Sequence, residues 1–215
     1  MQTPLRIDIV SDVMCPWCII GYKQLEGAMA EEGLAASVHW HPFELNSQMG
    51  PDGQNLAEHV AEKYGSTADQ SARTRNQMEA LGDALGFSFR FGPESRIRNS
   101  FRAHRLLHWA RDQDQMHSLK LALFAAHFTD QQNVDDPDVL AGIAAAIGLD
   151  ADTARSVAAT NAYADEVRAH EHFWTSRGVH GVPAMVFESR YLVTGAQGVG
   201  GYKSILQKVI ANSAA

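Results

Sequence analysis

The sequence predicts an α/β protein in which a large all-helical insertion divides the core that contains the β-strands. Strand-like patterns occur only near the two ends of the chain, and helical periodicity dominates from about residue 50 to residue 178. With 215 residues, 45% of them hydrophobic and 20% charged, the chain is long enough for one core with a sizeable insertion. We therefore assign residues 1–48 and 179–215 to the core and residues 49–178 to the insertion.

The opening segment has the pattern of a βαβ unit. Residues 5–10 alternate apolar and polar side chains as a strand does, and residues 11–14 form a short connection. A helix then runs from Cys15 to about Gly33, and its water-facing side is expected to consist of Lys23, Gln24, Glu26 and Glu31. Residues 37–43 alternate again as a second strand, which a helical crossover places parallel to the first.

The middle of the chain is almost wholly helical in pattern. Residues 119–128 are apolar on most faces, which predicts a buried helix. Pro137 suits the first turn of a helix that reaches about residue 146. Two further apolar stripes have helical spacing, and they consist of Ala103, Leu106, Leu107 and Ala110, and of Tyr163, Val167, His170 and Trp174.

The final segment returns to a strand pattern. Residues 183–187 and 191–194 are predicted strands, and the tight turn between them spans residues 188–190. A closing amphipathic helix is predicted from the spacing of Tyr202, Ile205, Leu206, Val209 and Ile210.

The charge distribution argues against nucleic acid as a partner. The formal net charge is -7, whereas a protein that binds duplex DNA or RNA normally presents a basic face. A locally basic run is diluted by apolar residues, and we interpret it as a solvated helix face. This run consists of Arg90, Arg96, Arg98, Arg102 and Arg105.

The sequence contains no candidate membrane or export segment. A bilayer span needs ~18 consecutive apolar residues, and no stretch approaches that length. Asp8 and Asp12 interrupt the apolar stretch that an amino-terminal secretory signal would need. We therefore expect a cytoplasmic protein that does not contact membranes.

The two cysteines form the motif Cys15-Pro16-Trp17-Cys18 at a predicted strand-to-helix junction. Free N–H groups and the helix dipole at such a position stabilise a thiolate, which is the attacking species in disulfide exchange. The spacing predicts an exposed Cys15 as nucleophile and a more buried Cys18, one turn later, as the resolving thiol. Pro16 suits the first helical position, and Trp17 offers an apolar contact to a substrate.

Two structural interpretations of the cysteines compete with a redox role. A structural zinc site needs four ligands, and His104 and His108 share a helix face at i and i+4, so a site with two cysteines and two histidines is one alternative. A permanent disulfide is the other, and it is disfavoured in a cytoplasmic protein.

Several motifs together resemble the DsbA family of the thioredoxin superfamily, in particular its cytoplasmic FrnE-like branch. The motif C-P-W-C follows the first strand, and Gly181-Val182-Pro183 precedes a late strand. Further stretches that match this branch are Asp8-Ile-Val-Ser-Asp-Val-Met-Cys-Pro-Trp-Cys18, Trp40-His-Pro-Phe-Glu-Leu45, Asn99-Ser-Phe-Arg-Ala-His-Arg-Leu106 and Val193-Thr-Gly-Ala-Gln197.

The resemblance implies a thioredoxin-like fold with a helical insertion, and it also implies roles for single residues. Pro183 is expected to be cis and to pack beside the cysteines, and the backbone of Val182 is expected to pair with a bound thiol peptide as an added strand. With Pro16 and Trp17, these residues form the expected substrate-binding set.

The resulting functional prediction is a thiol–disulfide oxidoreductase that acts on protein or low-molecular-weight thiols. The Cys15–Cys18 dithiol carries two electrons, so no metal or organic cofactor is required, and glutathione stays open as a co-substrate. Related proteins are often dimers, which leaves a homodimer open. One alternative is a glutathione-dependent isomerase or transferase, because the family resembles 2-hydroxychromene-2-carboxylate isomerase and the kappa-class glutathione transferases. Another is a non-enzymatic stress protein that binds metal or holds unfolded chains.

Other polar residues could approach the site without a predicted catalytic role. His41 and Glu44 follow the second strand, where a buried acid or imidazole could move a proton during resolution. Asn99 and Ser100 are expected to cap a helix, with a substrate contact as the alternative.

Overall fold

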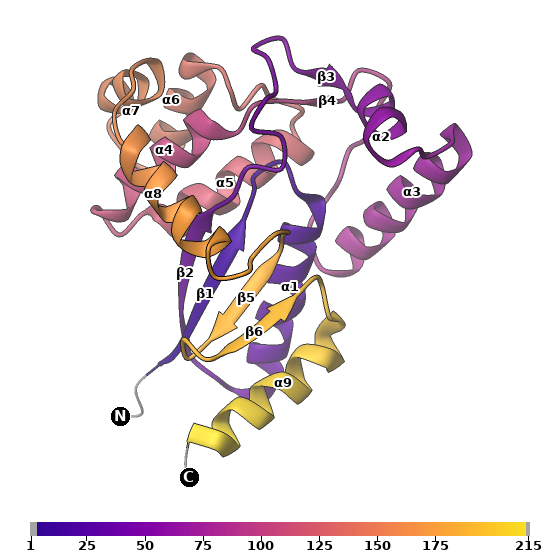
Figure 1. Ribbon diagram of the computed structural model, residues 1–215, viewed down its shortest axis with the longest axis vertical. Coiled ribbons are helices and arrows are strands. Elements are labelled where there is room, and N and C mark those ends of the chain that lie inside the picture. The colour runs from indigo at the N-terminus through magenta and orange to yellow at the C-terminus, as the bar shows by residue number, and fades with distance from the viewer. Residues whose placement is uncertain (1–3, 214–215) are drawn as a thin grey trace.

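The computed structural model describes residues 4–213 and contains a four-stranded sheet, a two-stranded ribbon and nine helices in that part of the chain (Figure 1). The amino- and carboxyl-terminal segments supply β1 (Leu5–Ser11), α1 (Pro16–Glu32), β2 (Ala36–Pro42), β5 (Ala184–Phe187), β6 (Tyr191–Thr194) and α9 (Gly198–Ser213). Between them lie β3 (Gln54–Asn55), α2 (Leu56–Tyr64), α3 (Ala68–Ala84), β4 (Arg96–Ile97), α4 (Phe101–Arg111), α5 (Met116–Phe128), α6 (Pro137–Ala146), α7 (Ala151–Ala159) and α8 (Ala164–Thr175). The predicted α/β fold with a helical insertion is confirmed. The ribbon of β3 and β4 was not predicted.

The sheet has the strand order β2-β1-β5-β6. β1 runs parallel to β2 and antiparallel to β5, which confirms the predicted βαβ unit. Ile9 pairs with Trp40 on one side and with Met185 on the other, so these three side chains share one face. The predicted tight turn joins β5 to β6, with Glu188 and Ser189 at φ values of 50° and 55°. Positive φ at two successive residues is typical of the shortest hairpin turns.

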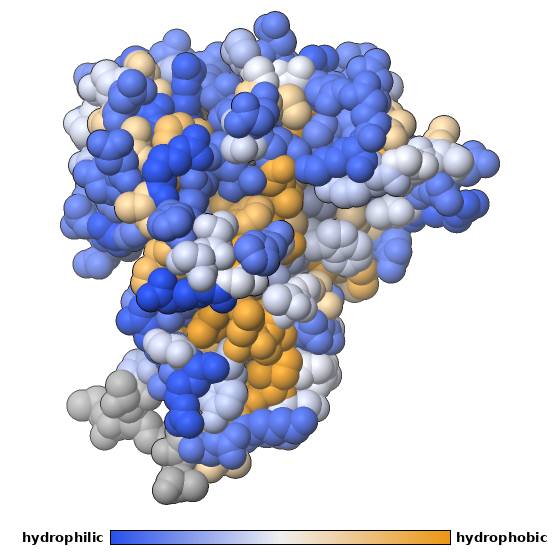
Figure 2. Space-filling model, viewed as in Figure 1, coloured by the Kyte–Doolittle hydropathy of each residue, from blue (hydrophilic) through white to orange (hydrophobic). Residues whose placement is uncertain are grey.

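Helices cover the two faces of this sheet unequally. The face that carries Ile9 packs against α1 and α9, which lie side by side (Figure 1). The opposite face carries Val10, which clusters with Trp174 of α8. An open groove of about 750 Å³ continues along this second face past Phe173 and Leu192 and contains neither cysteine. Figure 2 shows apolar side chains gathered over β5 and β6, below the more hydrophilic insertion.

The helices α4 to α7 enclose a second hydrophobic core. Leu106, Leu123 and Leu140 come from three different helices, and each is fully buried there. The predicted stripe along α4 and the predicted buried helix at α5 are both confirmed. Val13 and Met14, which precede the first cysteine, belong to this second core as well.

Both ends of α1 agree with the sequence prediction. Pro16 occupies the first turn, and Gly33 ends the helix at a φ of 63°, a left-handed conformation that glycine adopts without steric cost. The predicted exposure of Gln24 was wrong, because its side chain is 8% exposed and accepts a hydrogen bond from Gly198 at the start of α9. Since α9 covers this side of α1, little of the helix faces water.

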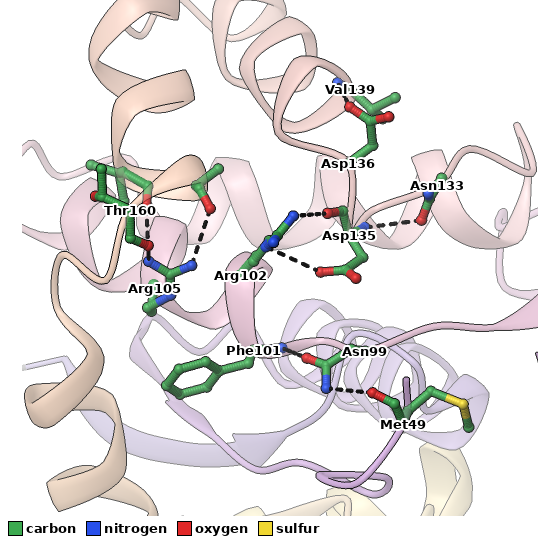
Figure 3. Close-up of polar contacts among 12 residues, drawn as sticks. Met49, Asn99, Phe101, Arg102, Arg105, Asn133, Asp135, Asp136, Val139 and Thr160 are labelled. Atoms are coloured by element: carbon green, nitrogen blue, oxygen red, sulfur yellow. Dashed lines mark hydrogen bonds and ion pairs between the residues drawn. The ribbon is translucent and has the colours of Figure 1, made fainter. Parts of the chain in front are cut away.

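The interpretation of the basic run as a solvated helix face was also wrong. Of its members, only Arg102 and Arg105 lie in a helix, and Arg105 is 3% exposed. The Arg105 guanidinium donates hydrogen bonds to backbone carbonyls at the end of α7, those of Val157, Ala158 and Thr160 (Figure 3). Arg96 and Arg98 donate instead to the carbonyl of Asp52. These arginines therefore join backbone segments through tertiary contacts.

No helix within residues 4–213 combines the length and the apolar content that crossing a bilayer requires.

Replacing Leu106 with alanine tests whether the second core contributes to the cooperative fold. The side chain is fully buried, so Leu106→Ala is expected to lower the free energy of unfolding by roughly 2–5 kcal/mol. Leu192→Ala is the matched control, since Leu192 is 47% exposed and its loss is expected to cost less than about 0.5 kcal/mol. Urea denaturation followed by circular dichroism measures both. Equal midpoints for the two variants would contradict the expectation.

Candidate active site

The segment before the cysteines is held by two hydrophobic cores. Val13 and Met14 are buried among the helices of the insertion, whereas Cys18 is fully buried in the core between the sheet and α1. Cys15 lies between them as the residue that caps the amino terminus of α1, with its backbone still extended. The motif thus lies where the two cores meet, and its backbone is anchored on both sides.

Both thiols are free, and that of Cys15 lies close to the backbone that precedes β5. The Cys15 Sγ atom lies 3.7 Å from the carbonyl oxygen of Val182. The peptide bond between Val182 and Pro183 is cis, as the resemblance implied. Cys15 is 3% exposed, so the prediction of an exposed thiol was wrong. The reason is that the backbone of Val182 and the residues that line an adjoining groove surround the sulfur.

Cys15 lies at the bottom of a groove with a volume of about 380 Å³. Of the four residues predicted to contact substrate, Pro16, Trp17 and Val182 line it, whereas Pro183 is buried and does not. Its remaining wall consists mainly of α2, α3 and the ribbon, with Tyr64, Arg75, Met78 and Arg96 among the side chains. A groove of this size lies in the range of small-ligand sites, and it mixes apolar walls with a few cationic groups.

Asp12 is a buried carboxylate next to the cysteine motif. It accepts hydrogen bonds from the backbone N–H groups of Leu45 (2.7 Å) and Met14 (3.1 Å). His104 Nε2 lies 3.6 Å from the same carboxylate. Burial acts to raise the pKa of Asp12, but His104 and the two backbone donors outweigh it, so the pKa is lowered. Asp12 is therefore ionised inside the protein.

The position of Cys15 at a helix start does not make it acidic in the reduced protein. The hydrogen bond with Cys18 and burial raise the pKa of the Cys15 thiol well above its ordinary value, and the negative charge of Asp12 adds to this effect. The backbone N–H of Cys18 acts in the lowering direction, as the helix position predicted, but it is outweighed. The expected lowering of the Cys15 pKa was therefore wrong, because the hydrogen bond with Cys18, the burial of the sulfur and the charge of Asp12 depend on tertiary packing that the sequence does not reveal.

Two other candidates, His41 and Glu44, do not reach the cysteines. His41 bonds to Asp8 at 2.8 Å and packs on Trp174, on the sheet face opposite α1. Glu44 is paired with Arg168 of α8. Neither residue lines the groove above Cys15.

Asn99 has a structural role at the start of α4. Its side chain accepts a hydrogen bond from Phe101 N–H (2.8 Å) and donates one to the carbonyl of Met49 (3.2 Å) (Figure 3). Ser100 makes no capping hydrogen bond with its side chain. Neither residue lines the groove, so the structure does not support the substrate contact that was the alternative for this stretch.

The two-cysteine, two-histidine zinc site is not assembled. His104 faces Asp12, whereas His108 contacts Tyr163 and His170 elsewhere on the insertion. Within residues 4–213, no three His, Cys, Asp or Glu side chains are grouped so that they could hold a metal ion.

Two charged residues near the dithiol were missed from the sequence, Asp12 and Lys120. Lys120 is 1% exposed and lies in α5, within the stretch predicted to be a buried helix. A single lysine inside an otherwise apolar helix was the available signal, because lysine is almost never fully buried without a partner. Asp12 carried no comparable signal in its own sequence neighbourhood.

Replacing Asp12 with asparagine is expected to have two measurable effects. The substitution breaks the buried contact with His104 and leaves the Leu45 N–H opposite an amide donor. It should therefore lower the free energy of unfolding by roughly 3 kcal/mol at pH 7. Because the folded pKa of Asp12 is lowered, its contribution is present above about pH 4 and is lost as the pH falls further. The stability difference between wild type and Asp12→Asn should therefore shrink below about pH 4 in urea titrations.

The second effect concerns the thiol, because loss of the negative charge should make Cys15 more acidic and speed its alkylation at neutral pH. Asp152→Asn, at an exposed aspartate, is the control. A stability difference that stays constant with pH, or an unchanged alkylation rate, would contradict these assignments.

The comparisons with known proteins agree with this geometry. Residues 6–207 match the DSBA-like thioredoxin domain family. A probable DsbA oxidoreductase of Streptomyces coelicolor is 32% identical and superposes with a TM-score of 0.89, over 96% of this chain and 90% of that one. The YwbO protein of Bacillus subtilis (strain 168) is 25% identical over 209 residues, which are 97% of this chain and 96% of YwbO.

A more distant structure shares the fold alone. The 2-hydroxychromene-2-carboxylate isomerase structure has a TM-score of 0.71 at 14% identity, over 97% of this chain and 98% of that one. The thioredoxin-like fold with a DsbA-like helical insertion is thereby confirmed. The chain belongs to the DSBA-like thioredoxin domain family.

Proposed function

We propose that the protein exchanges disulfides with protein or low-molecular-weight thiol substrates through Cys15 and Cys18. The observation that carries this proposal is the position of Cys15. Its sulfur is a free thiol at the start of α1, 3.7 Å from the carbonyl of Val182, at the bottom of a groove open to substrate. Membership of the DSBA-like family supports the same chemistry.

The proposed reaction has two steps when the dithiol reduces a substrate disulfide. The Cys15 thiolate attacks one substrate sulfur, which forms a mixed disulfide and releases the other substrate sulfur as a thiolate. Cys18 then loses its proton and attacks the Cys15 sulfur, which breaks the mixed disulfide and releases the second substrate thiolate. Two electrons pass to the substrate, and the protein ends with a Cys15–Cys18 disulfide. The reverse sequence oxidises a substrate dithiol.

The groove supports a role for the backbone of Val182 in holding the substrate. Its carbonyl lies beside the reacting sulfur just before β5, where an extended peptide can add to the exposed backbone as a short strand. Pro16 and Trp17 supply apolar contacts on the other side of Cys15. Arg75 and Arg96 line the same groove, and they favour substrates that carry a carboxylate, such as glutathione or the end of a peptide.

The shared sequence stretches support assignment to the FrnE-like branch, and with it a cytoplasmic location. Glutathione-dependent isomerisation is the alternative function, favoured by the fold shared with 2-hydroxychromene-2-carboxylate isomerase. Those enzymes typically carry serine at the position of Cys15, whereas this chain has both thiols. The two functions differ in whether Cys18 is required, which makes that residue the discriminating one.

Trapping the mixed disulfide tests the proposal. Cys18→Ser removes the resolving thiol, so incubation with oxidised glutathione should yield a stable adduct on Cys15, detected as a mass increase of one glutathione. Cys15→Ser should give no adduct and should abolish reduction of a disulfide-linked fluorescent peptide. The wild type should accumulate an intramolecular disulfide instead.

The controls separate disulfide exchange from isomerisation. If Cys15→Ser and Cys18→Ser both keep the wild-type rate of glutathione-dependent isomerisation of 2-hydroxychromene-2-carboxylate, neither thiol is needed and the isomerase alternative gains. If neither cysteine variant changes the exchange rate, the proposed function is wrong.

A further inference from the structure

Two buried carboxyl groups meet between α8 and the segment that follows β2. Glu44 lies in that segment, and its side chain is 3% exposed. Glu171 lies on α8, and its side chain is 13% exposed. Neither residue lines the groove above Cys15, and the exchange chemistry uses neither of them. Burying an ionised carboxylate is costly unless its charge is balanced and each of its oxygens finds a donor.

Arg168 brings the two carboxyl groups together. Its Nη1 atom donates to Oε1 of Glu44 and also to Oε2 of Glu171, the second at 2.8 Å. Because one nitrogen contacts both groups, the carboxyls are neighbours, and they are hydrogen-bond partners of each other as well. The guanidinium itself lies over the ring of Phe101, 3.9 Å from the ring centroid. A single cation therefore faces two acids.

The second oxygen of each carboxyl group lacks a donor. Within residues 4–213, Oε2 of Glu44 and Oε1 of Glu171 are fully buried and have no hydrogen-bond partner. An ionised carboxylate only accepts hydrogen bonds, so two carboxylates cannot satisfy each other, whereas a protonated carboxyl has one O–H donor. One proton held between the two groups supplies the missing donor. It also leaves a single negative charge opposite Arg168.

The other charged groups near this pair do not change the balance. His104, on α4, acts to lower the pKa of Glu44, whereas Asp12 acts to raise the pKa of Glu171. These two groups are engaged with each other at 3.6 Å. Burial, followed by the charge of Glu171, raises the pKa of Glu44, and burial raises the pKa of Glu171 in spite of Arg168. The charge balance and the missing donors thus favour the same protonated pair.

We infer that Glu44 and Glu171 share one proton in an O–H···O hydrogen bond, and that this bond is a pH-sensitive clamp between α8 and the segment after β2. Loss of the proton to solvent leaves two carboxylates that repel each other across one guanidinium. The clamped segment includes Leu45, whose N–H donates to Asp12 at 2.7 Å and which lines the groove above Cys15. Release of the clamp is therefore expected to loosen one wall of that groove. The inference goes beyond the exchange chemistry and does not depend on it.

Infrared spectroscopy detects the shared proton directly, because a protonated carboxyl has a C=O band that a carboxylate lacks. The wild type is expected to show this band at pH 6, where an ordinary glutamate is almost fully ionised. Glu44→Gln removes one acid and keeps a hydrogen bond to Glu171 through its amide, so the band should lose the intensity of one carboxyl per molecule. Glu166→Gln, at an exposed glutamate on the same helix, should keep the band of the wild type.

The clamp is tested by urea denaturation and hydrogen exchange, with wild type and Glu44→Gln compared at equal pH. Because the folded pKa values are raised, the contribution of the proton is complete below about pH 4 and is lost as the pH rises through the folded midpoint. Between pH 5 and pH 9, the urea midpoint of the wild type should therefore fall relative to that of the variant. Protection of the Leu45 N–H should fall about tenfold over the same range, again relative to the variant.

Each result decides part of the inference. Equal carboxyl bands in the wild type and folded Glu44→Gln would overturn the shared proton, and parallel pH dependences of the two proteins would overturn the clamp. If Glu44→Gln does not fold, Glu171→Gln places the same amide on the other side of the pair and replaces it in all three measurements. Failure of the wild type to exchange disulfides would refute the proposed function and would leave these measurements unaffected.

Discussion

The geometry of this molecule depends on the hydrogen bonds that the ionised carboxylate of Asp12 accepts. This carboxylate lies fully buried between the end of β1 and the cysteine motif. Its oxygens bind the backbone of Leu45, beyond β2, and of Met14, next to Cys15, while His104 faces it from the helical insertion. One side chain thus fixes three segments that are distant in sequence. A buried charge with so many partners is costly to break, which keeps these segments in a single arrangement.

The same contact explains why the dithiol lies between two cores. Val13 and Met14 are buried among the insertion helices, and Cys18 is buried against the sheet. The turn that Asp12 holds lets the chain pass from one core to the other within a few residues. The raised pKa of Cys15 follows from this geometry, since the hydrogen bond with Cys18, burial and the charge of Asp12 outweigh the backbone N–H of Cys18 at the start of the helix.

Elements governed by local sequence could be predicted, and contacts formed across the fold could not. The strand at β1, the start of α1 at Pro16 and its end at Gly33 follow from alternation, proline and glycine, which act within a few residues. Arg105 looked like a surface residue because its partners at the end of α7 lie more than 50 positions away. The hydrogen-bond partner of Lys120, Ser11, is 109 positions away, and that of Asp12 beyond its own turn, Leu45, is 33 positions away. Burial of a polar group depends on its tertiary partners, and no local pattern encodes them.

The helix α2 has a consequence for the range of molecules that can reach Cys15. It supplies part of the groove wall, yet none of its residues is buried. An element with so little buried apolar surface unfolds locally at a small free-energy cost compared with the global transition. α1 and the sheet beneath it are deeply buried and do not share this property. For the proposed exchange reaction this means that α1 and the sheet fix the position of the Cys15 sulfur, while local unfolding of α2 limits how bulky a disulfide substrate can be.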